Sequence, residues 1–261
     1  MRKIDRHKAG SFSWVELATT DQAAAKSFYT ALFGWTVEDS PMGPDEFYSM
    51  FRLEGLDAAA AYTLRKEPRE HGVPAHWGIY VAVESADASA KRAAELGGAV
   101  LAPAFDVFDH GRMAVLQDPT GAPFSVWQPR KHSGIGIAGV DGTLCWADLS
   151  TPDPGKATTF YSGLFGWKIA AGEHDPSGYL HIANGDDFIG GIPPASNRNS
   201  RVPPHWLVYF LTSDCDAAAT KAKRLGARFH LEPTTMERVG RMAVLADPQG
   251  ATFAIFQPMR K

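Results

Sequence analysis

A long internal repeat constrains this chain more than any other feature of its sequence. Residues 14–35 and 146–167 are identical at 11 of 22 positions, and residues 111–129 and 240–258 at 13 of 19. The two copies are therefore offset by 132 residues at the first pair of segments and by 129 at the second. Solenoid units repeat every roughly 20–50 residues, so this spacing instead predicts two copies of a whole domain.

Each copy has the same predicted order of elements, beginning with a strand at 13–18. Thr20-Asp21 follows and supplies a helix N-cap and a first-turn acid, and Gly34 is suited to end that helix because glycine accepts the left-handed backbone of a C-cap. Three short strands are predicted next, which completes a β-α-β-β-β module. After a loop at 64–74 the order restarts, with a strand near 77–83, a helix at 86–96 and three more strands near 100–105, 113–116 and 124–127.

The repeat also sets the predicted domain boundaries. We expect a first domain at 12–129, a linker rich in glycine and basic residues at 130–142, and a second domain at 143–258. Residues 1–11 are polar and are expected to form a frayed lead-in. In the second copy the helix is predicted at 154–165 and a loop at 193–204.

This arrangement resembles the vicinal oxygen chelate superfamily, which includes glyoxalase I, extradiol dioxygenases and bleomycin-resistance proteins. The resemblance rests on the strand–Asp–helix motif ending in Leu-Phe-Gly and on Asp-Pro-x-Gly-x-x-Phe, each present in both copies. Two-domain actinobacterial members loosely named hydroxylases are especially similar. The resemblance implies an α+β fold with two tandem domains, each a pair of βαβββ modules that form a curved mixed-sheet cup. Pairing of modules within or between domains stays open.

Composition indicates which classes of partner the protein can bind and in which compartment it is expected. The net charge of −3 argues against a nucleic-acid binder, and no apolar run approaches the roughly 18 residues of a membrane span. Cys145 and Cys215 lie at unmatched places in the repeat, which favours a reducing, cytoplasmic location, and the charged N-terminus does not resemble a signal peptide. We expect a small-molecule ligand, with no nucleic-acid or membrane partner. Tandem copies in the family can replace a homodimer, which implies a monomer or a weak homodimer.

The metal-ligand positions that the resemblance implies lack suitable donors. Metal-using relatives carry a His or Gln seven residues before the Asp that opens the helix, where this chain has Trp14 and Trp146. The next implied ligand positions hold Gly78 and Leu207, and those on the last strand hold Ser125 and Ala254. A catalytic divalent metal needs three or more converging N or O ligands. We therefore predict no metal and no cofactor, unless a two-residue shift brings His76 or His205 to the site.

Strand alternation predicts which side chains face the cups, because every second side chain lies on the same side of a sheet. The predicted ligand-binding residues are Trp14, Glu16, His76, Tyr80, Ser125 and Trp127 in the first copy, and Trp146, Asp148, His205, Tyr209 and Phe256 in the second. Aromatic walls with a few polar groups are typical of a small-molecule pocket.

Each candidate also has a structural interpretation. Glu16 and Asp148 are either a base or ligand anchor, or salt-bridged strand residues. His76 and His205 are candidate acid–base groups, although an imidazole that caps the preceding loop is favoured over catalysis. The tyrosines and tryptophans either line a pocket or fill the core. Arg112 and Arg241 either bind an anion or, as favoured, pair with Asp118 and Asp247 across a hairpin.

Three functions are consistent with these residues, and the sequence leaves open whether the protein is an enzyme. The first is metal-independent binding of an aromatic or hydrophobic metabolite or antibiotic. The second is a hydroxylase, isomerase or lyase whose catalytic candidates are Glu16, His76, Asp148 and His205. The third is a metal-dependent glyoxalase or dioxygenase with ligands that the implied positions do not reveal.

Overall fold

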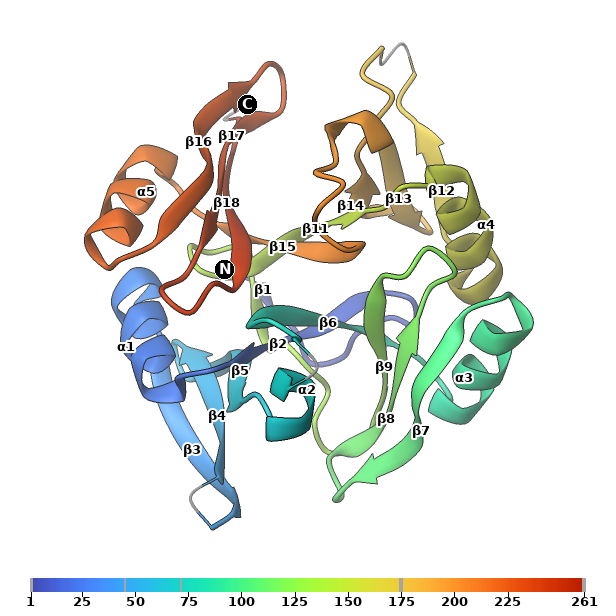
Figure 1. Cartoon of the computed structure of the whole chain (residues 1–261), viewed down its shortest axis with the longest axis horizontal. Helices are drawn as coiled ribbons and strands as arrows, with labels where there is room; N and C mark the ends of the chain where they lie inside the picture. The colour runs from blue at the N-terminus through green and yellow to red at the C-terminus, as the bar shows by residue number, and fades with distance from the viewer. Residues whose placement is uncertain (1, 45, 71, 174–175, 260–261) are drawn as a thin grey trace.

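The computed structural model describes residues 2–44, 46–70, 72–173 and 176–259 (Figure 1). Within these residues each copy of the repeat forms one eight-stranded sheet. The order in the first sheet is β3-β4-β5-β2-β6-β9-β8-β7. Its strands are β2 (Phe12–Thr19), β3 (Thr36–Gly43), β4 (Glu46–Leu53), β5 (Leu56–Thr63), β6 (His76–Ala82), β7 (Ala99–Val107), β8 (Gly111–Gln117) and β9 (Pro123–Pro129).

The second sheet repeats this order as β12-β13-β14-β11-β15-β18-β17-β16. Its strands are β11 (Leu144–Ser150), β12 (Lys168–Ala171), β13 (Leu180–Asn184), β14 (Asp187–Ile192), β15 (His205–Leu211), β16 (Arg228–Met236), β17 (Gly240–Ala246) and β18 (Thr252–Pro258). The helices are α1 (Gln22–Phe33), α2 (Lys66–Glu70), α3 (Ala86–Glu95), α4 (Pro154–Phe165), α5 (Cys215–Arg224) and the short 3₁₀ helix η1 (Ala195–Asn197).

Both modules of a domain join through their first strands. β2 pairs antiparallel with β6, and each is flanked by a parallel strand of its own module, β5 beside β2 and β9 beside β6. The second domain has the same arrangement around β11 and β15. Each curved mixed sheet is thus built within one domain, which answers the pairing question that the sequence left open and confirms the α+β fold.

The first helix of each domain ends as its sequence predicts, but α1 begins one residue later than expected, with Asp21 as its N-cap rather than as a first-turn acid. The Asp21 side chain accepts from Ala24 N, and the Asp153 side chain accepts from Lys156 N. Gly34 and Gly166 cap the two C-termini with φ of 73° and 71°, a left-handed conformation that is costly for other residues. These caps fix where each helix leaves the sheet.

The N-terminal segment is more ordered than its composition predicts. β1 (Arg2–Lys3) pairs antiparallel with β10 (Ile137–Ala138), which lies inside the predicted linker. His7 also contacts the carbonyl of Ile135 through Nε2 at 2.9 Å. The polar lead-in is therefore attached to the connection between the domains, because pairing with β10 satisfies its backbone.

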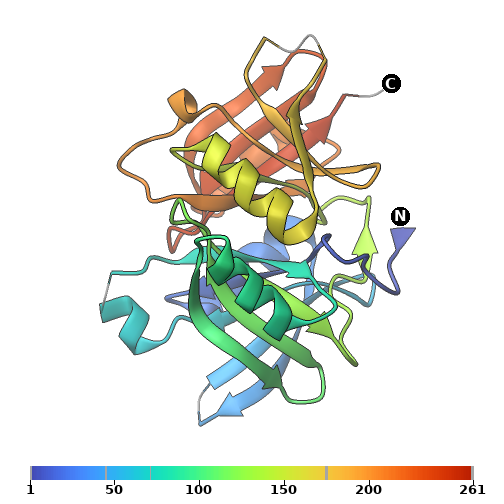
Figure 2. The same ribbon diagram turned by 90° about the vertical axis from the view of Figure 1, so that its right-hand side faces the viewer.

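The two domains pack closely, one above the other in Figure 2. α1 lies against α5 and α3 against α4, and Figure 1 shows these two helix pairs on opposite sides of the molecule. Phe28 of α1 packs its ring 6.2 Å from Phe253 of β18, and Phe160 of α4 packs 6.1 Å from Phe124 of β9. One hydrophobic core therefore runs through both domains.

Candidate functional site

A buried polar cluster lies on the concave face of the first sheet, the face opposite the helices. Glu16 of β2 accepts hydrogen bonds from the hydroxyls of Tyr48 on β4, at 2.9 Å, and Tyr80 on β6. The Trp14 indole Nε1 donates to the Tyr48 hydroxyl at 3.0 Å. Alternation places Val15 and Leu17 on the opposite, helix-facing side, where both are fully buried.

The second sheet holds the same cluster with a shorter acid. Asp148 of β11 accepts from the hydroxyl of Tyr179 at 2.5 Å and from that of Tyr209 at 2.7 Å. The Trp146 indole Nε1 lies 3.0 Å from Asp148 Oδ1 and 2.8 Å from the Tyr179 hydroxyl. Both cups therefore hold one carboxylate, two phenols and one indole in a single hydrogen-bonded group.

Burial dominates the electrostatics of both acids. Removal from water raises the pKa of the Glu16 carboxyl, and the hydrogen bonds from Tyr80 and Tyr48 only partly oppose this rise. Burial likewise raises the pKa of Asp148 against the opposing hydrogen bonds from Tyr179, Tyr209 and Trp146. Both carboxyls consequently hold a proton to higher pH than an exposed acid would.

The two candidate histidines lie at the starts of their strands. His76 Nδ1 is 2.8 Å from the carbonyl of Pro74, and His205 Nδ1 is 2.9 Å from that of Pro203. In each case the imidazole contacts the backbone of the loop that precedes its strand, as the loop-capping interpretation expects. Burial lowers the pKa of His205. In the strand register His76 lies opposite Ala18, and His205 lies opposite Ser150. Each of these partners is two residues beyond the acid, so the histidines lie next to the polar cluster along the sheet.

The remaining candidates line the same concave faces. Ser125 is the register partner of Tyr80, and Trp127 donates from Nε1 to the carbonyl of His132 at 2.9 Å. Phe256 packs with Tyr209 and Trp146 in a hydrophobic cluster separate from the main core. Trp14, Glu16 and Tyr80, which alternation predicts on one side of the sheet, are thus neighbours in the structure. Their counterparts Trp146, Asp148 and Tyr209 are neighbours as well.

Two tyrosines of the clusters were not among the predicted site residues. Tyr48 and Tyr179 occupy equivalent positions. Tyr48 lies two residues before Met50, and Tyr179 lies two residues before His181. Met50 and His181 are equivalent because each is paired with the residue that lies beside the acid in the sheet. Both lie in or beside strands that the sequence predicts. The usable signal was a tyrosine recurring at matching places of the two copies. The resemblance implies ligand positions on the inner strands alone and therefore does not point to these two tyrosines.

A glycine makes room for the second cluster. A Cβ atom built on Gly191 of β14 would lie only 1.9 Å from the Tyr179 hydroxyl oxygen. The Tyr179 ring therefore crosses β14 where that strand has no side chain, and so reaches Asp148. In the first domain the equivalent position is Ala60, the register partner of Glu16.

A pocket opens beside the second cluster. It has a volume of about 420 Å³ and is lined by residues of β12, β13 and β14 and of the adjoining turns, including Ala170, His181, Ala183 and Phe188. The His181 ring lies 5.0 Å from that of Tyr179 and 5.4 Å from that of Phe188. His181 thus connects the pocket to the hydrogen-bonded acid.

The donors present do not fit a divalent metal. Among the described ranges, no group of three or more His, Cys, Asp or Glu side chains is placed to hold an ion. The His181 imidazole lies near Asp148 but is not bonded to it. The hydrogen-bond partners of Glu16 are phenols, and those of Asp148 are phenols and an indole. These groups donate hydrogen bonds to the carboxylate, whereas metal ligands must offer lone pairs.

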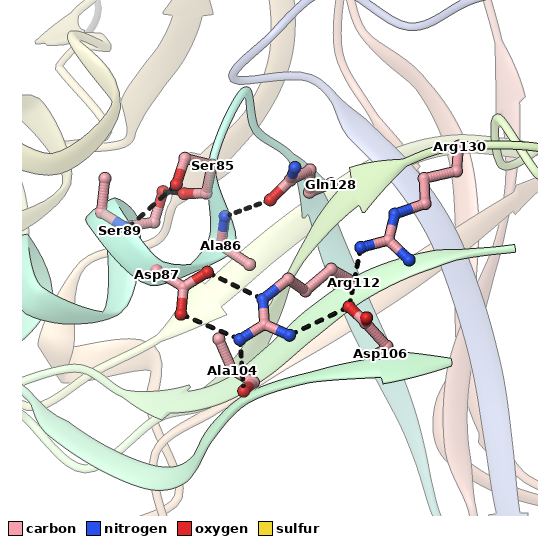
Figure 3. A network of polar contacts seen from close by, with 10 residues as sticks. Ser85, Ala86, Asp87, Ser89, Ala104, Asp106, Arg112, Gln128 and Arg130 are labelled. Atoms are coloured by element: carbon pink, nitrogen blue, oxygen red, sulfur yellow. Dashed lines mark hydrogen bonds and ion pairs between the residues drawn. The ribbon is translucent and has the colours of Figure 1, made fainter. Parts of the chain in front are cut away.

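Arg112 and its counterpart Arg241 hold the outer strands to a helix. Figure 3 shows Arg112 of β8 forming two hydrogen bonds to Asp87 of α3, at 2.7 and 3.0 Å, and one to Asp106 of β7. Arg241 binds Asp216 of α5 in the same two-bonded manner. The partner is thus a helix acid rather than the predicted turn acids Asp118 and Asp247, because the helix lies directly behind the hairpin.

The turn acids instead join the two domains. Asp247 accepts from the Tyr29 hydroxyl at 3.0 Å, and Asp118 accepts from the Tyr161 hydroxyl at 3.1 Å. Each tyrosine also accepts from a tryptophan Nε1 of its own domain, Trp77 in the first and Trp206 in the second. These hydrogen bonds therefore cross the domain interface in both directions, from the first helix of each domain to the last turn of the other.

Comparison of the sequence with known protein families shows which family has two cups of this kind. The profile of the Glyoxalase/Bleomycin resistance protein/Dioxygenase superfamily matches residues 11–126 and 143–255, so the chain belongs to that superfamily. The CFP32 protein of Mycobacterium tuberculosis, which carries the name of a glyoxylase, is 41% identical over 266 residues, covering 99% of this chain and 98% of CFP32. The anthracycline biosynthesis protein DauV of a Streptomyces species is 37% identical, covering 97% of this chain and 95% of DauV.

Solved structures of lower identity share the fold. The Mn(II)-bound glyoxalase of Novosphingobium aromaticivorans superimposes with a TM-score of 0.67 at 17% identity, covering 97% of this chain and 83% of that one. A catechol 2,3-dioxygenase gives 0.64 at 13% identity, covering 97% and 90%. No helix within the described residues has the length and apolar character that a membrane span requires.

Proposed function

We propose that this protein binds a small aromatic or hydrophobic metabolite or antibiotic within a cup, without the help of a metal ion. The observation that carries the proposal is the carboxylate–phenol–indole cluster on each concave face, with donors already supplied by tyrosine and tryptophan. An aromatic wall with few, fixed polar groups suits a ligand of drug-like size. The pocket of about 420 Å³ beside Asp148 falls in the size range of such sites.

The hydrogen bonds of the cluster favour a ligand that donates. Both phenol protons of the second cluster are directed at Asp148, so the hydroxyls of Tyr179 and Tyr209 offer lone pairs to a further partner. The Tyr179 hydroxyl already accepts from Trp146, which leaves that of Tyr209 as the better acceptor. Ligands with phenolic, alcoholic or amino groups are therefore preferred over ligands that only accept.

The named relatives support the same class of ligand. DauV and the Streptomyces peucetius protein DnrV, both 37% identical to this chain, are called anthracycline biosynthesis proteins. Their names associate chains of this length and fold with aromatic antibiotics. We extend that association to this chain as part of the proposal.

Calorimetric titration with a set of anthracyclines and smaller phenols tests the proposal. We expect saturable binding by protein that has been treated with a chelator, with unchanged affinity after Zn, Ni, Mn or Fe is restored. Elemental analysis of untreated protein provides the control. Binding that requires stoichiometric metal would disprove metal independence, and no saturable binding of any aromatic probe would disprove the proposal.

The raised pKa of the two acids favours one alternative, an enzyme that uses them as acid–base groups. A carboxyl that keeps its proton to higher pH than an exposed acid is better suited to act as a general acid. If a bound ligand is turned over by metal-free protein, Glu16→Gln and Asp148→Asn should remove that turnover. The double variant His76→Ala, His205→Ala should leave it intact if the histidines only cap loops, and its loss would assign them to catalysis.

A further inference from the structure

The outer parts of the two cups differ although their strands match. In the first domain Arg52 is the register partner of Thr36 and Asp57. In the second domain Ala183 is the register partner of Lys168 and Phe188, with the same bulge beside it. Arg52 therefore corresponds to Ala183, Asp57 to Phe188 and, by the same register, Glu38 to Ala170. Charged residues of the first cup are thus replaced by apolar residues in the second.

The charged residues bind one another on the outer strands of the first cup. Arg52 forms ion pairs with Glu38 at 2.5 Å and Asp57 at 2.9 Å. His132 lies 3.5 Å from Asp57 through Nε2. We call Glu38, Arg52, Asp57 and His132 the ionic plug. Long side chains held by several partners leave little space for a ligand, because moving any one of them breaks an ion pair.

His132 also closes the inner part of the first cup. Its ring meets that of Trp14 edge-on at 4.8 Å between centroids and that of Trp127 at 6.1 Å. The segment that carries it is fixed on both sides, since His132 N donates to His110 O and Ile135 N donates to Ser13 O. Trp14 and Trp127 are accordingly part of the main buried core.

The second cup is open at the matching place. Ala170, Ala183 and Phe188 line the pocket, and Phe188 exposes 66% of its surface. An apolar ring this exposed gains free energy when another apolar surface covers it. His181 provides a second ring at the inner wall, next to Tyr179 and Asp148.

We infer that the second cup alone holds the ligand, which presents a flat aromatic ring to Phe188 and His181. This inference rests on the proposed function and adds which repeat performs it and by which contacts. The first cup then serves as a structural copy that its ionic plug keeps closed. Lys168 and Asp186 at the pocket rim are placed to contact polar substituents on the ring.

Fluorine NMR of protein labelled with 5-fluorotryptophan distinguishes the cups. Of the seven tryptophans, Trp146 reports on the second cup, while Trp14 and Trp127 report on the first. The probe is 2-naphthol, with cyclohexanol as a control that keeps the hydroxyl and lacks the flat ring. We expect 2-naphthol to shift the Trp146 resonance in a saturable manner and cyclohexanol to have no such effect.

A transplant of the plug makes the test sharper. The variant Ala170→Glu, Ala183→Arg introduces the first cup's ion pair into the second pocket, and we expect binding of 2-naphthol to weaken about tenfold or more because the aromatic surface is no longer accessible. The matched control, Glu38→Ala with Arg52→Ala, alters the first cup and should leave the Trp146 response unchanged. Resonances of Trp35 and Trp167, buried at the domain interface, verify that each variant is folded.

The outcomes separate the inference from the function it rests on. A saturable shift at Trp14 or Trp127 in place of Trp146, or a folded transplant that binds 2-naphthol as well as the natural sequence does, would overturn the assignment to the second cup while leaving aromatic binding intact. No response from any tryptophan to 2-naphthol or to the anthracyclines would overturn both.

Discussion

The hydroxyl of Tyr29 in the first domain donates to Asp247 in the last turn of the second domain at 3.0 Å, across 218 residues of chain. Asp247 is completely buried and also accepts from the backbone N–H groups of Gln249 and Ala251. Its burial raises its pKa, so the hydrogen bonds are needed to offset the loss of water. The matching bond from Tyr161 to Asp118 makes this link reciprocal.

Replacing Tyr29 by Phe should destabilise both domains together. The substitution removes a donor from a buried acid, so we expect the free energy of unfolding to fall by about 1–3 kcal/mol. Urea denaturation followed by far-ultraviolet circular dichroism measures this change. Tyr62→Phe is the matched control, because the Tyr62 hydroxyl forms no such interdomain bond and its loss should change stability little. A Tyr29→Phe protein as stable as the control would show that the bond contributes no net stability.

The raised pKa of Asp148 predicts how stability depends on pH. A carboxyl with a folded-state pKa above its unfolded value of about 3.9 stabilises the protein fully below that value, and the contribution is lost as pH rises through the folded-state pKa. Asp148→Asn cannot titrate, so its stability relative to the natural protein should increase as pH rises from 4 towards 8. Unfolding curves at several pH values measure the difference. A decrease over the same range would mean that the tyrosine hydrogen bonds outweigh burial.

Substitution of Gly191 by Ala should displace Tyr179 from Asp148. The new methyl group would lie 1.9 Å from the Tyr179 hydroxyl oxygen, so either the ring or β14 must shift, at a cost of about 1–3 kcal/mol. Thermal unfolding detects the loss, and a crystal structure of the variant shows the tyrosine. Gly155→Ala in α4 is the control of opposite sign, since its Cβ meets nothing closer than 3.5 Å and alanine favours a helix. Equal effects at both glycines would contradict the close contact.

Aromatic binding in the second cup predicts an effect at Tyr209. Tyr209→Phe keeps the ring and removes the hydroxyl that offers a lone pair to the ligand, so affinity for 2-naphthol should fall by about tenfold while a methyl ether of the same ring is affected much less. Tyr80→Phe makes the equivalent change in the first cup and serves as control. Calorimetric titration of both variants gives the comparison. Equal losses for both probes would place the effect in altered packing rather than in a hydrogen bond.

Local signals were enough to predict most of the fold. Asp21 and Gly34 specify the ends of α1 through short-range hydrogen bonds, and alternation along β2 separates Glu16 from Val15 and Leu17. Such features depend on residues close in the sequence. Each of these signals occurs in both copies of the repeat, and its recurrence supports the same predicted element twice.

Contacts between distant segments were harder to predict. Nothing near Arg52 indicates that it meets Glu38, or that His132 of the linker packs on Trp14. These contacts involve residues that differ between the two copies, whereas the predicted elements rest on residues that the copies share. Arg112 shows the same limit, because its partner Asp87 depends on how α3 lies behind the sheet.

The bond from Tyr29 to Asp247 also bears on synthesis of the chain. A ribosome makes the whole of the first sheet before residue 247 exists, so α1 emerges with Tyr29 lacking its partner Asp247 in the last turn and Phe28 lacking its partner Phe253 on β18. Tyr29 packs on Trp35, Phe51 and Trp77 of its own domain from the start, but the part of α1 that meets Phe253 stays uncovered until the final hairpin is made. Residues of the hairpin around Asp247 therefore complete the burial of a helix whose Tyr29 is made 218 residues earlier, and a nascent chain that stalls before them would leave the Phe28 side of α1 open to chaperones.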